Sequence, residues 1–428
     1  MTNDMINKIT GILSSEGIKK YLINKKEKSS SELFFIKKRL DLRRSTSITD
    51  YKVTVYRDEE KDGVKLRGSA AVDIFPTMSD EEIREKLKGA YFAAQFALNP
   101  FFELVSGDGK ADDITLNIPY STDEAAKMMA DALFSADNDD EAFINSAEVF
   151  AVKEKIRIVN SDGINASFER FNINGEFVTQ CKTNEDVELH YSFDYDKADE
   201  KAIAEKAAEG IKSAKDRSAA KRSLKSGNYD IIISGKELTT VLSYYIDKSN
   251  SAYIYAKYSD YAAGTNVQGE NISGEGLNIT CVATQPYSAE GIKMTDLNLI
   301  ENGELKAIHG GNRFGQYLGI APTGDYEKIR LDAGTESLEE MKKKPYLQAV
   351  KFSDFQMDFF TGHFGGEIRL AYLYDGEKVT KVTGGSINGI ISEVHKHLVF
   401  SKEKYSDSNY EGPFALKIEN VAVAGSGE

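Results

Sequence analysis

The sequence predicts an α+β fold of two domains, with helices packed on mixed or antiparallel sheets and a second half richer in strands. A chain of 428 residues is long enough for two domains. Strand and helix patterns are mixed along the chain and do not alternate regularly, as they would in a doubly wound parallel sheet. A polar, glycine-containing break at 223–230 follows a long run of helix formers. We therefore place the domain boundary near residue 226, which gives domains 1–225 and 226–428.

The elements of the first half follow from spacing and capping. Apolar residues at helical spacing between positions 5 and 13 predict a first helix. Residues 51–56 and 65–75 have the pattern of neighbouring strands joined by a charged turn. Capping boxes at Ser79/Glu82 and Ser121/Glu124 predict one helix that ends at Pro100 and a second over 122–135. Consecutive strands are expected over 148–180, and a helix over 199–222.

The second half contains more strand signals. A strand at 228–234 leads into a helical pattern at 236–247. Asn302-Gly303 and Asp375-Gly376 are typical hairpin turns, so they predict hairpins within 295–308 and 355–379. Residues 414–425 are either a final strand pair or one long bent strand.

Composition excludes several classes of partner. The chain carries 54 Lys and Arg against 68 Asp and Glu, a net charge of −14, which disfavours binding to nucleic acid or anionic membranes. The one dense basic segment, 19–31, is interpreted as a solvated linker, with a local basic patch as the alternative. The sequence contains no run of eighteen apolar residues, so no membrane span is predicted. The absence of a signal-peptide pattern and the two distant cysteines predict a cytoplasmic protein.

Chemistry-bearing motifs are sparse. Phosphate-binding glycine loops and a nucleophile elbow are missing, and Cys181 and Cys281 lie in strand-like runs where buried thiols are unreactive. The segment "ISEVHKHLVFSK" (391–402) places His395 and His397 two residues apart. On a strand they would converge like metal ligands, whereas on a helix they diverge. Apolar spacing over 387–398 favours the helix, so a metal site at this pair is not favoured, although His309, His363 and one of the pair could meet in space.

Several segments together resemble one family. "LNLIENGELKAIHGGNRFGQYLGIAPTGD" (297–325), "FQMDFFTGHFGGEIRLAYLYDGEKV" (355–379), "GPFALKIENVAVAG" (412–425) and "IRIVNSDG" (156–163) follow the order of motifs in the TldD/PmbA family. This family was historically labelled modulator of DNA gyrase. The resemblance spans most of the chain and is strongest over 228–428.

The resemblance implies a zinc site that this chain has lost. Catalytic TldD-like members carry HExxxH on a helix after a Ser-Gly strand end, and a cysteine near the C-terminus completes the site. Here the matching stretch is "IIISGKELTTVLSYYIDK" (231–248), which places Leu242, Ser243 and Asp247 at the positions of the first histidine, the glutamate and the second histidine. The position of the cysteine falls near Phe400 or Ser401. The pattern resembles the PmbA (TldE-like) branch, which lacks the motif.

The resemblance therefore implies a non-catalytic subunit of a heteromeric metallopeptidase that processes or degrades small or unfolded peptides. A TldD-like partner would supply the zinc, and this chain would hold no catalytic residue, metal or cofactor of its own. Two alternatives stay open. One is a self-sufficient hydrolase with a relocated metal site drawn from Asp247, His309, His363 and His395. The other is a homodimeric peptide-binding or scaffold protein. The gyrase label would imply a role on DNA, which the acidic composition does not support.

Overall fold

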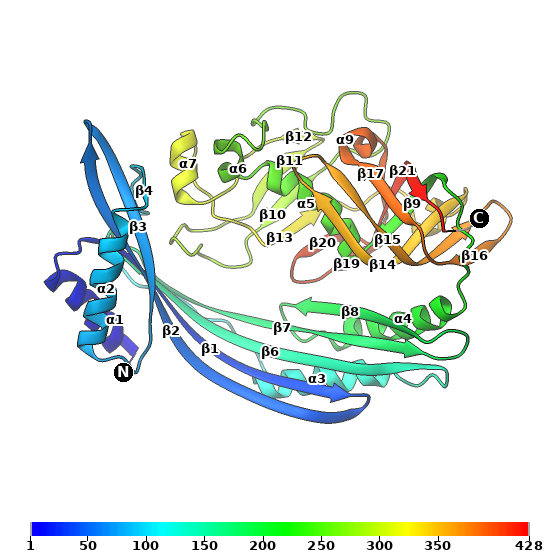
Figure 1. The fold of residues 1–428 in the computed structure, drawn as a ribbon, viewed down its shortest axis with the longest axis horizontal. Coiled ribbons are helices and arrows are strands. Elements are labelled where there is room, and N and C mark those ends of the chain that lie inside the picture. Colours follow the sequence, from blue (N-terminus) through cyan, green and yellow to red (C-terminus); the bar gives the residue numbers. More distant parts are fainter. Residues whose placement is uncertain (1, 427–428) are drawn as a thin grey trace.

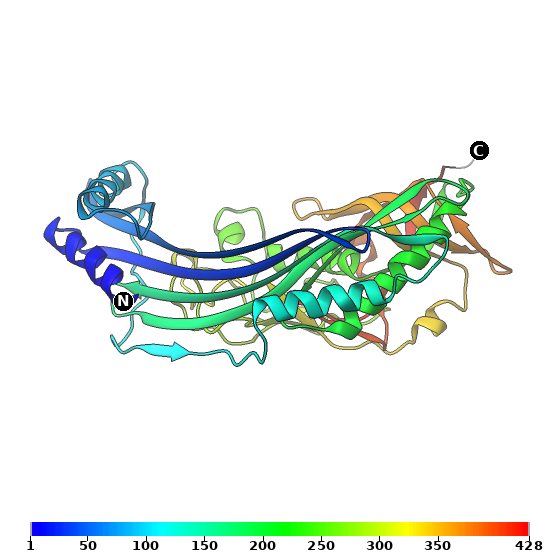
Figure 2. The same ribbon diagram turned by 90° about the horizontal axis from the view of Figure 1, so that it is seen from below.

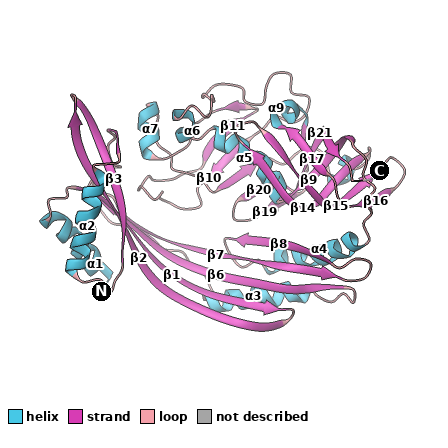
Figure 3. Cartoon of the chain, in the orientation of Figure 1, coloured by secondary structure: helices cyan, strands magenta, loops and turns pink. Residues whose placement is uncertain are grey.

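The computed structural model describes residues 2–426, which form three sheets and their covering helices. Strand pairing is mostly antiparallel, with parallel pairs β5–β7, β13–β20 and β14–β9. The predicted α+β class with mixed sheets is therefore confirmed. Thirteen of the 21 described strands belong to the second half, but the long strands belong to the first, as Figure 3 shows. Within residues 2–426, no helix is both long and apolar enough to span a membrane.

The first sheet is built from the N-terminal half in the order β4-β3-β2-β1-β6-β7-β5, with β8 paired to β7. Figure 2 shows α3 and α4 along one face of this curved sheet and α1 and α2 at its far end. The strands are β1 (Lys20–Ile36), β2 (Arg39–Lys61), β3 (Val64–Ile74), β4 (Leu98–Pro100), β5 (Asp112–Ile114), β6 (Ala142–Asn160), β7 (Asn165–Cys181) and β8 (Val187–Tyr195). The helices are α1 (Thr2–Ser15), α2 (Asp80–Ala94), α3 (Thr122–Ser135) and α4 (Glu200–Ser218).

Local capping signals predicted the starts of α2 and α3. Both predicted capping boxes form, because each serine accepts from the backbone N–H three residues on while the glutamate accepts from the serine N–H. The helix opened by Ser79 ends at Ala94, earlier than predicted, and Leu98–Pro100 pairs with β3 instead.

The interpretation of residues 19–31 as a solvated linker is wrong. This segment forms most of β1, which lies between β2 and β6 in the middle of the sheet. Its lysines are accommodated by neighbouring acids: Lys25 pairs with Glu27 at 2.5 Å, and Lys26 pairs with Glu154 of β6 at 3.0 Å. Charged residues are compatible with a central strand when partners on the same strand or the next one neutralise them.

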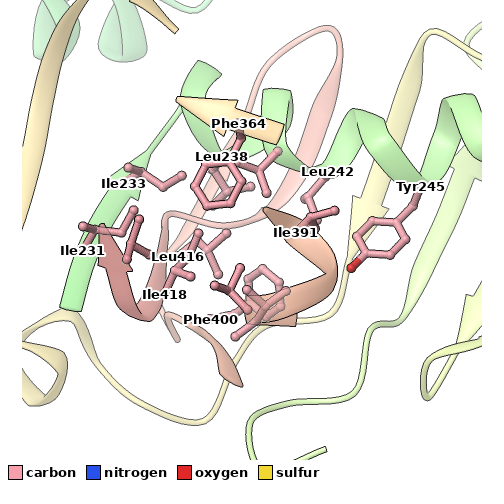
Figure 4. Close-up of a cluster of buried hydrophobic side chains, with 14 of the residues drawn as sticks. Ile231, Ile233, Leu238, Leu242, Tyr245, Phe364, Ile391, Phe400, Leu416 and Ile418 are labelled. Carbon is pink, nitrogen blue, oxygen red and sulfur yellow. The ribbon is translucent and has the colours of Figure 1, made fainter. Parts of the chain in front are cut away.

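The second half forms two further sheets. One has the order β12-β11-β10-β13-β20-β19, and the other has the order β14-β9-β21-β17-β15-β16 with β18 paired to β21. An additional pairing of β14 with β15 closes β14, β9, β21, β17 and β15 into a ring of strands. A large hydrophobic cluster with Leu242, Tyr245 and Phe364 fills the space between these elements (Figure 4).

The elements of this half have the following bounds. The strands are β9 (Gly227–Ser234), β10 (Ile279–Val282), β11 (Leu297–Glu301), β12 (Glu304–Leu305), β13 (Lys328–Leu331), β14 (Tyr346–Asp358), β15 (His363–Tyr374), β16 (Val379–Val382), β17 (Ser386–Ile390), β18 (Leu398–Phe400), β19 (Lys404–Ser406), β20 (Tyr410–Pro413) and β21 (Ala415–Ala424). The helices are α5 (Lys236–Lys248), α6 (Ser251–Tyr255), α7 (Asn312–Leu318), α8 (Leu338–Met341) and α9 (Ile391–Val394), followed by a 3-10 turn, η1 (His395–His397).

Both hairpin predictions are confirmed. Asn302 and Gly303 have positive φ values of 48° and 77°, the backbone that a tight hairpin turn between β11 and β12 requires. Asp375 accepts hydrogen bonds from the N–H groups of Glu377 and Lys378 and so closes the turn between β15 and β16. Residues 415–424 form one long strand with a register shift between Ile418 and Val421, so the bent-strand alternative is correct.

The helix predicted over 387–398 is much shorter than its apolar spacing suggested. Residues 386–390 form strand β17, only 391–397 are helical, and 398–400 return to a strand. A short apolar run does not distinguish a buried strand from a helix, and here pairing with β15 and β21 decides for the strand.

The domain division at residue 226 stays a proposal. The strands of the first sheet all precede residue 196, and the strands of the other two sheets all follow residue 226. Helix α4 lies between the two groups and contacts both the first sheet and β15.

Candidate functional site

Helix α5 carries the positions at which the family resemblance implies metal ligands. It starts at a sharp turn after β9, where Gly235 adopts φ 61° and ψ −128°. An L side chain rarely adopts this backbone, so the turn favours glycine. The helix then presents Leu238, Val241, Leu242 and Tyr245 to the core.

Leu242 is fully buried in the hydrophobic cluster of the second half, as Figure 4 shows. Phe400 is 4% exposed and belongs to the same cluster. Leu242 stands where the resemblance places the first histidine, and Phe400 is one of the two residues, with Ser401, near which it places the cysteine. An apolar side chain therefore occupies the first position, and a benzyl or hydroxyl group occupies the second.

The other aligned positions make local contacts. The Ser243 hydroxyl donates to the Thr240 carbonyl at 2.8 Å, a bond within α5 itself. The Ser401 hydroxyl donates to the Glu403 carbonyl and accepts from the Ala415 N–H, both at 3.0 Å, so it ties the residues after β18 to β21. Asp247 is half-buried at the end of α5, and burial raises the pKa of its carboxyl.

Among the three candidate histidines of a relocated site, His309 lies near the aligned position Asp247. It is 3% exposed, and its Nε2–H donates to the Ile246 carbonyl at 2.9 Å, which leaves Nδ1 without a hydrogen-bond partner among the described residues. Burial lowers the pKa of its imidazole, while the charges of Asp325 and Asp247 act in the opposite direction. His309 and Asp247 are thus brought together at the end of α5.

His363 and His395 do not join this pair. His363 is exposed at the start of β15. His395 is 8% exposed, and its Nδ1 forms a 3.2 Å hydrogen bond with the Tyr245 hydroxyl. Burial lowers the pKa of His395 to about 4, with a smaller contribution from the Lys396 charge. His397 bonds instead to the Ser273 hydroxyl, so the neighbouring histidines diverge as the helical interpretation predicts.

The comparisons with known proteins start from the second half. Residues 226–425 match the family described as PmbA/TldA metallopeptidase C-terminal domain. These residues form a domain of the PmbA/TldA metallopeptidase family. Curated protein sequences gave no match.

Three solved structures share the fold of this chain. TldE from Thermococcus kodakarensis is 16% identical with a TM-score of 0.77, covering 98% of this chain and 100% of its own. A candidate DNA gyrase modulator from Thermotoga maritima MSB8 is 14% identical with a TM-score of 0.77, covering 99% of this chain and 100% of its own. A candidate gyrase modulator from Bacteroides thetaiotaomicron VPI-5482 is 15% identical with a TM-score of 0.74, covering 98% of both chains. At these identities the likeness concerns the fold.

The residues of this chain do not fit the zinc ion that the resemblance implies for catalytic members. Leu242 offers no donor atom, and the hydroxyl of Ser243 is bonded within its helix. A single carboxylate at Asp247 cannot supply the three or four ligands that zinc requires. Within the part of the chain that the structure describes, no group of three or more His, Cys, Asp or Glu side chains could hold a metal ion.

Cys181 and Cys281 are both free and buried, as predicted from their strand-like surroundings. Burial raises the pKa of Cys281 to about 12, so its thiol stays protonated at neutral pH and is a poor nucleophile.

Sequence reasoning missed a second group of residues, at the start of α5. A cavity of about 480 Å³ lies between α4, β8, α5 and β19, and a neighbouring cavity of about 440 Å³ lies between β8, α5 and β14. Both are lined by Ser192, Lys236, Glu237 and Lys351. These residues come from distant parts of the sequence, so no motif spacing could have indicated them.

Proposed function

We propose that this chain is the non-catalytic subunit of a heteromeric metallopeptidase that processes or degrades small or unfolded peptides. A TldD-like partner would supply the zinc ion and the general base. The observation that carries the proposal is the burial of Leu242 in a hydrophobic cluster that also contains Phe400, where the resemblance places one zinc-binding histidine and, near Phe400 or Ser401, the cysteine.

The physical argument is one of donor chemistry. Zinc is bound by imidazole, thiolate or carboxylate, and it lowers the pKa of its water toward neutrality. A subunit without such donors can still contribute by enclosing and orienting a peptide, because correct positioning lowers the barrier that a partner's catalytic groups must overcome.

Co-expression with a TldD-like protein from the same source tests this proposal. We expect the two chains to co-elute in size-exclusion chromatography, with zinc near one ion per pair and none in this chain alone. Peptide cleavage should require both chains. A homodimer that ignores the TldD-like protein would favour the scaffold alternative and contradict the proposal.

The proximity of Asp247 and His309 supports a second candidate function, a hydrolase with a relocated metal site. His309 is buried, and its Nδ1 has no hydrogen-bond partner among the described residues. Asp247 lies nearby. If this chain cleaved peptides unaided, Asp247→Asn and His309→Gln should both abolish the activity. Under the proposed function, the same variants leave cleavage by the complex within about twofold of wild type, provided that urea unfolding shows them folded.

A further inference from the structure

Strand β8 presents an unpaired edge toward the second half of the molecule (Figure 1). Two contacts establish which of its backbone groups face this edge. The carbonyl of Glu188 accepts from Arg369 Nη2 at 3.3 Å, and the carbonyl of Asp194 accepts from the Ser408 N–H at 3.0 Å. Backbone groups alternate in direction along an antiparallel strand, so those of His190 and Ser192 face the same edge.

No described residue takes up the backbone N–H and C=O groups of His190 and Ser192. Both residues are exposed. Arg369 bounds this stretch at one end and Ser408 at the other. An unpaired strand edge is a template on which another extended chain can add as a further strand. The unpaired stretch of β8 around His190 and Ser192 is long enough to pair with about three residues of a peptide.

The two cavities described above lie along this same edge. The smaller is lined by Glu188, His190 and Ser192, with Phe352 and Phe355 opposite. The larger is lined by Ser192 and Tyr195, toward the end of β8. The two cavities share four lining residues, Ser192, Lys236, Glu237 and Lys351, so they form one cleft that runs along β8. We call this the β8 cleft.

The larger cavity has a surplus of positive charge in an otherwise acidic protein. Its wall carries five lysines, 201, 206, 236, 351 and 404, against four acids, Asp199, Glu205, Glu209 and Glu237. Of these acids, Glu205 pairs with Lys201 at 3.7 Å, and Asp199 caps α4. Two of the acids are thus already engaged.

Lys206 and Lys351 are the two half-buried lysines of this cavity, whereas Lys201, Lys236 and Lys404 are exposed. Among the described residues, neither has a carboxylate within ion-pair distance, and Lys351 Nζ lies 3.8 Å from the centre of the Tyr191 ring. Burial lowers the pKa of Lys351 to about 8 and also lowers the pKa of Lys206. An anion between the two ammonium groups would be stabilised by both.

We propose that the β8 cleft binds the C-terminal segment of a short extended peptide, which adds as a strand parallel to β8 and places its terminal carboxylate beside Lys206 and Lys351. The parallel direction follows from the position of Lys206, which lines only the larger cavity, toward the C-terminal end of β8. The aromatic rings of the smaller cavity would receive apolar side chains of the peptide. This inference rests on the proposed peptide-handling function, and it assigns binding, not chemistry, to the start of α5.

Fluorescence anisotropy of the isolated full chain tests the proposal. The probe is a hexapeptide of Ala, Phe and Ser with fluorescein at its N-terminus, compared with the same peptide carrying a C-terminal amide. We expect the free acid to bind about tenfold more tightly than the amide. Lys351→Met should remove this preference, whereas Lys378→Met, at a distant hairpin turn, should keep it.

Ser192→Pro tests the added strand, with Ser192→Ala as the matched control. Proline removes a single N–H, and this N–H faces the free edge, where proline is tolerated in strands. We expect Ser192→Pro to weaken binding of both peptides at least fivefold and Ser192→Ala to change it less than twofold. Thermal unfolding must show the variants to be folded, and a second edge variant, His190→Pro, replaces Ser192→Pro if it is not.

The outcomes separate this inference from the proposed function. Equal affinity for acid and amide, unchanged binding by the edge variants, or no binding up to 1 mM peptide overturns the β8 cleft. Assembly with a TldD-like subunit and cleavage by the complex would still support the proposed function in that case. Conversely, peptide binding with these signatures but without any assembly would contradict the proposed function and leave the cleft in place.

Discussion

Between pH 7.5 and pH 5.0 this protein should lose folding stability, and replacing His395 with glutamine should reduce that loss by about 2 kcal/mol. Burial lowers the pKa of His395 from 6.5 to about 4 in the folded chain. The unfolded chain therefore binds a proton first as the pH falls, and stability is lost between the two pKa values. Stability is fully present above the unfolded value and decreases toward pH 4.

The magnitude follows from the two pKa values. At pH 5.0, an unfolded pKa of 6.5 and a folded pKa of about 4 correspond to a loss of about 2 kcal/mol relative to pH 7.5, at 1.36 kcal/mol per pH unit. His309 also has a lowered pKa and contributes its own loss, so the informative quantity is the difference between wild type and variant.

Urea unfolding monitored by tyrosine fluorescence and circular dichroism at pH 7.5 and 5.0 measures this difference. Glutamine keeps an acceptor for the Tyr245 hydroxyl but does not titrate. His363→Gln, at an exposed position, is the matched control and should lose as much stability as wild type. Equal losses for wild type and His395→Gln would refute the assignment of His395 as a neutral core residue. Stabilisation of wild type by added Zn²⁺, absent in the variant, would indicate a ligand instead.

Three further predictions concern stability in urea at pH 7.5. Leu242→Ala should cost about 2–5 kcal/mol, because it opens a cavity in the core, whereas Ser243→Ala on the same helix should cost less than about 1 kcal/mol; similar costs would contradict the core role of Leu242. Asp58→Asn should cost about 2–3 kcal/mol, since Arg67 is 1% exposed and would keep an unpaired charge, and a neutral result would show that water reaches the guanidinium. Burial alone would raise the pKa of Asp216, but hydrogen bonds from two lysines and a tyrosine lower it overall from 3.8, so Asp216→Asn should destabilise at pH 7.5 and matter less only as the pH falls below about 4; an effect that stays constant in that acid range would contradict this.

Features determined by adjacent residues were predictable from the sequence. The capping boxes at Ser79 and Ser121 and the Asn302-Gly303 turn satisfy their own backbone groups, so their geometry depends little on the rest of the chain. The family motifs also lie within short segments, and they indicated the match that residues 226–425 show.

Features that depend on distant partners were not predictable in the same way. The basic segment 19–31 became a central strand because acids such as Glu154 on a distant strand compensate its lysines. The β17 strand was missed because a short apolar run has no distinctive period when both of its neighbours come from elsewhere in the sequence. The cluster of charged residues around Lys351 could not be recognised in the sequence, because these residues come together only where α4, β8 and α5 pack against one another.

The ring of strands in the second half can close only late in the translation of this protein. Strand β21 pairs with β9 on one side and β17 on the other, so it occupies an interior place in the ring. Translation delivers it after every other member. While residues 415–424 are still inside the ribosome, β9 and β17 have unsatisfied edges that invite pairing with other nascent chains. This half should therefore depend on chaperones during translation more than the first sheet does, and truncation before residue 415 should yield insoluble product.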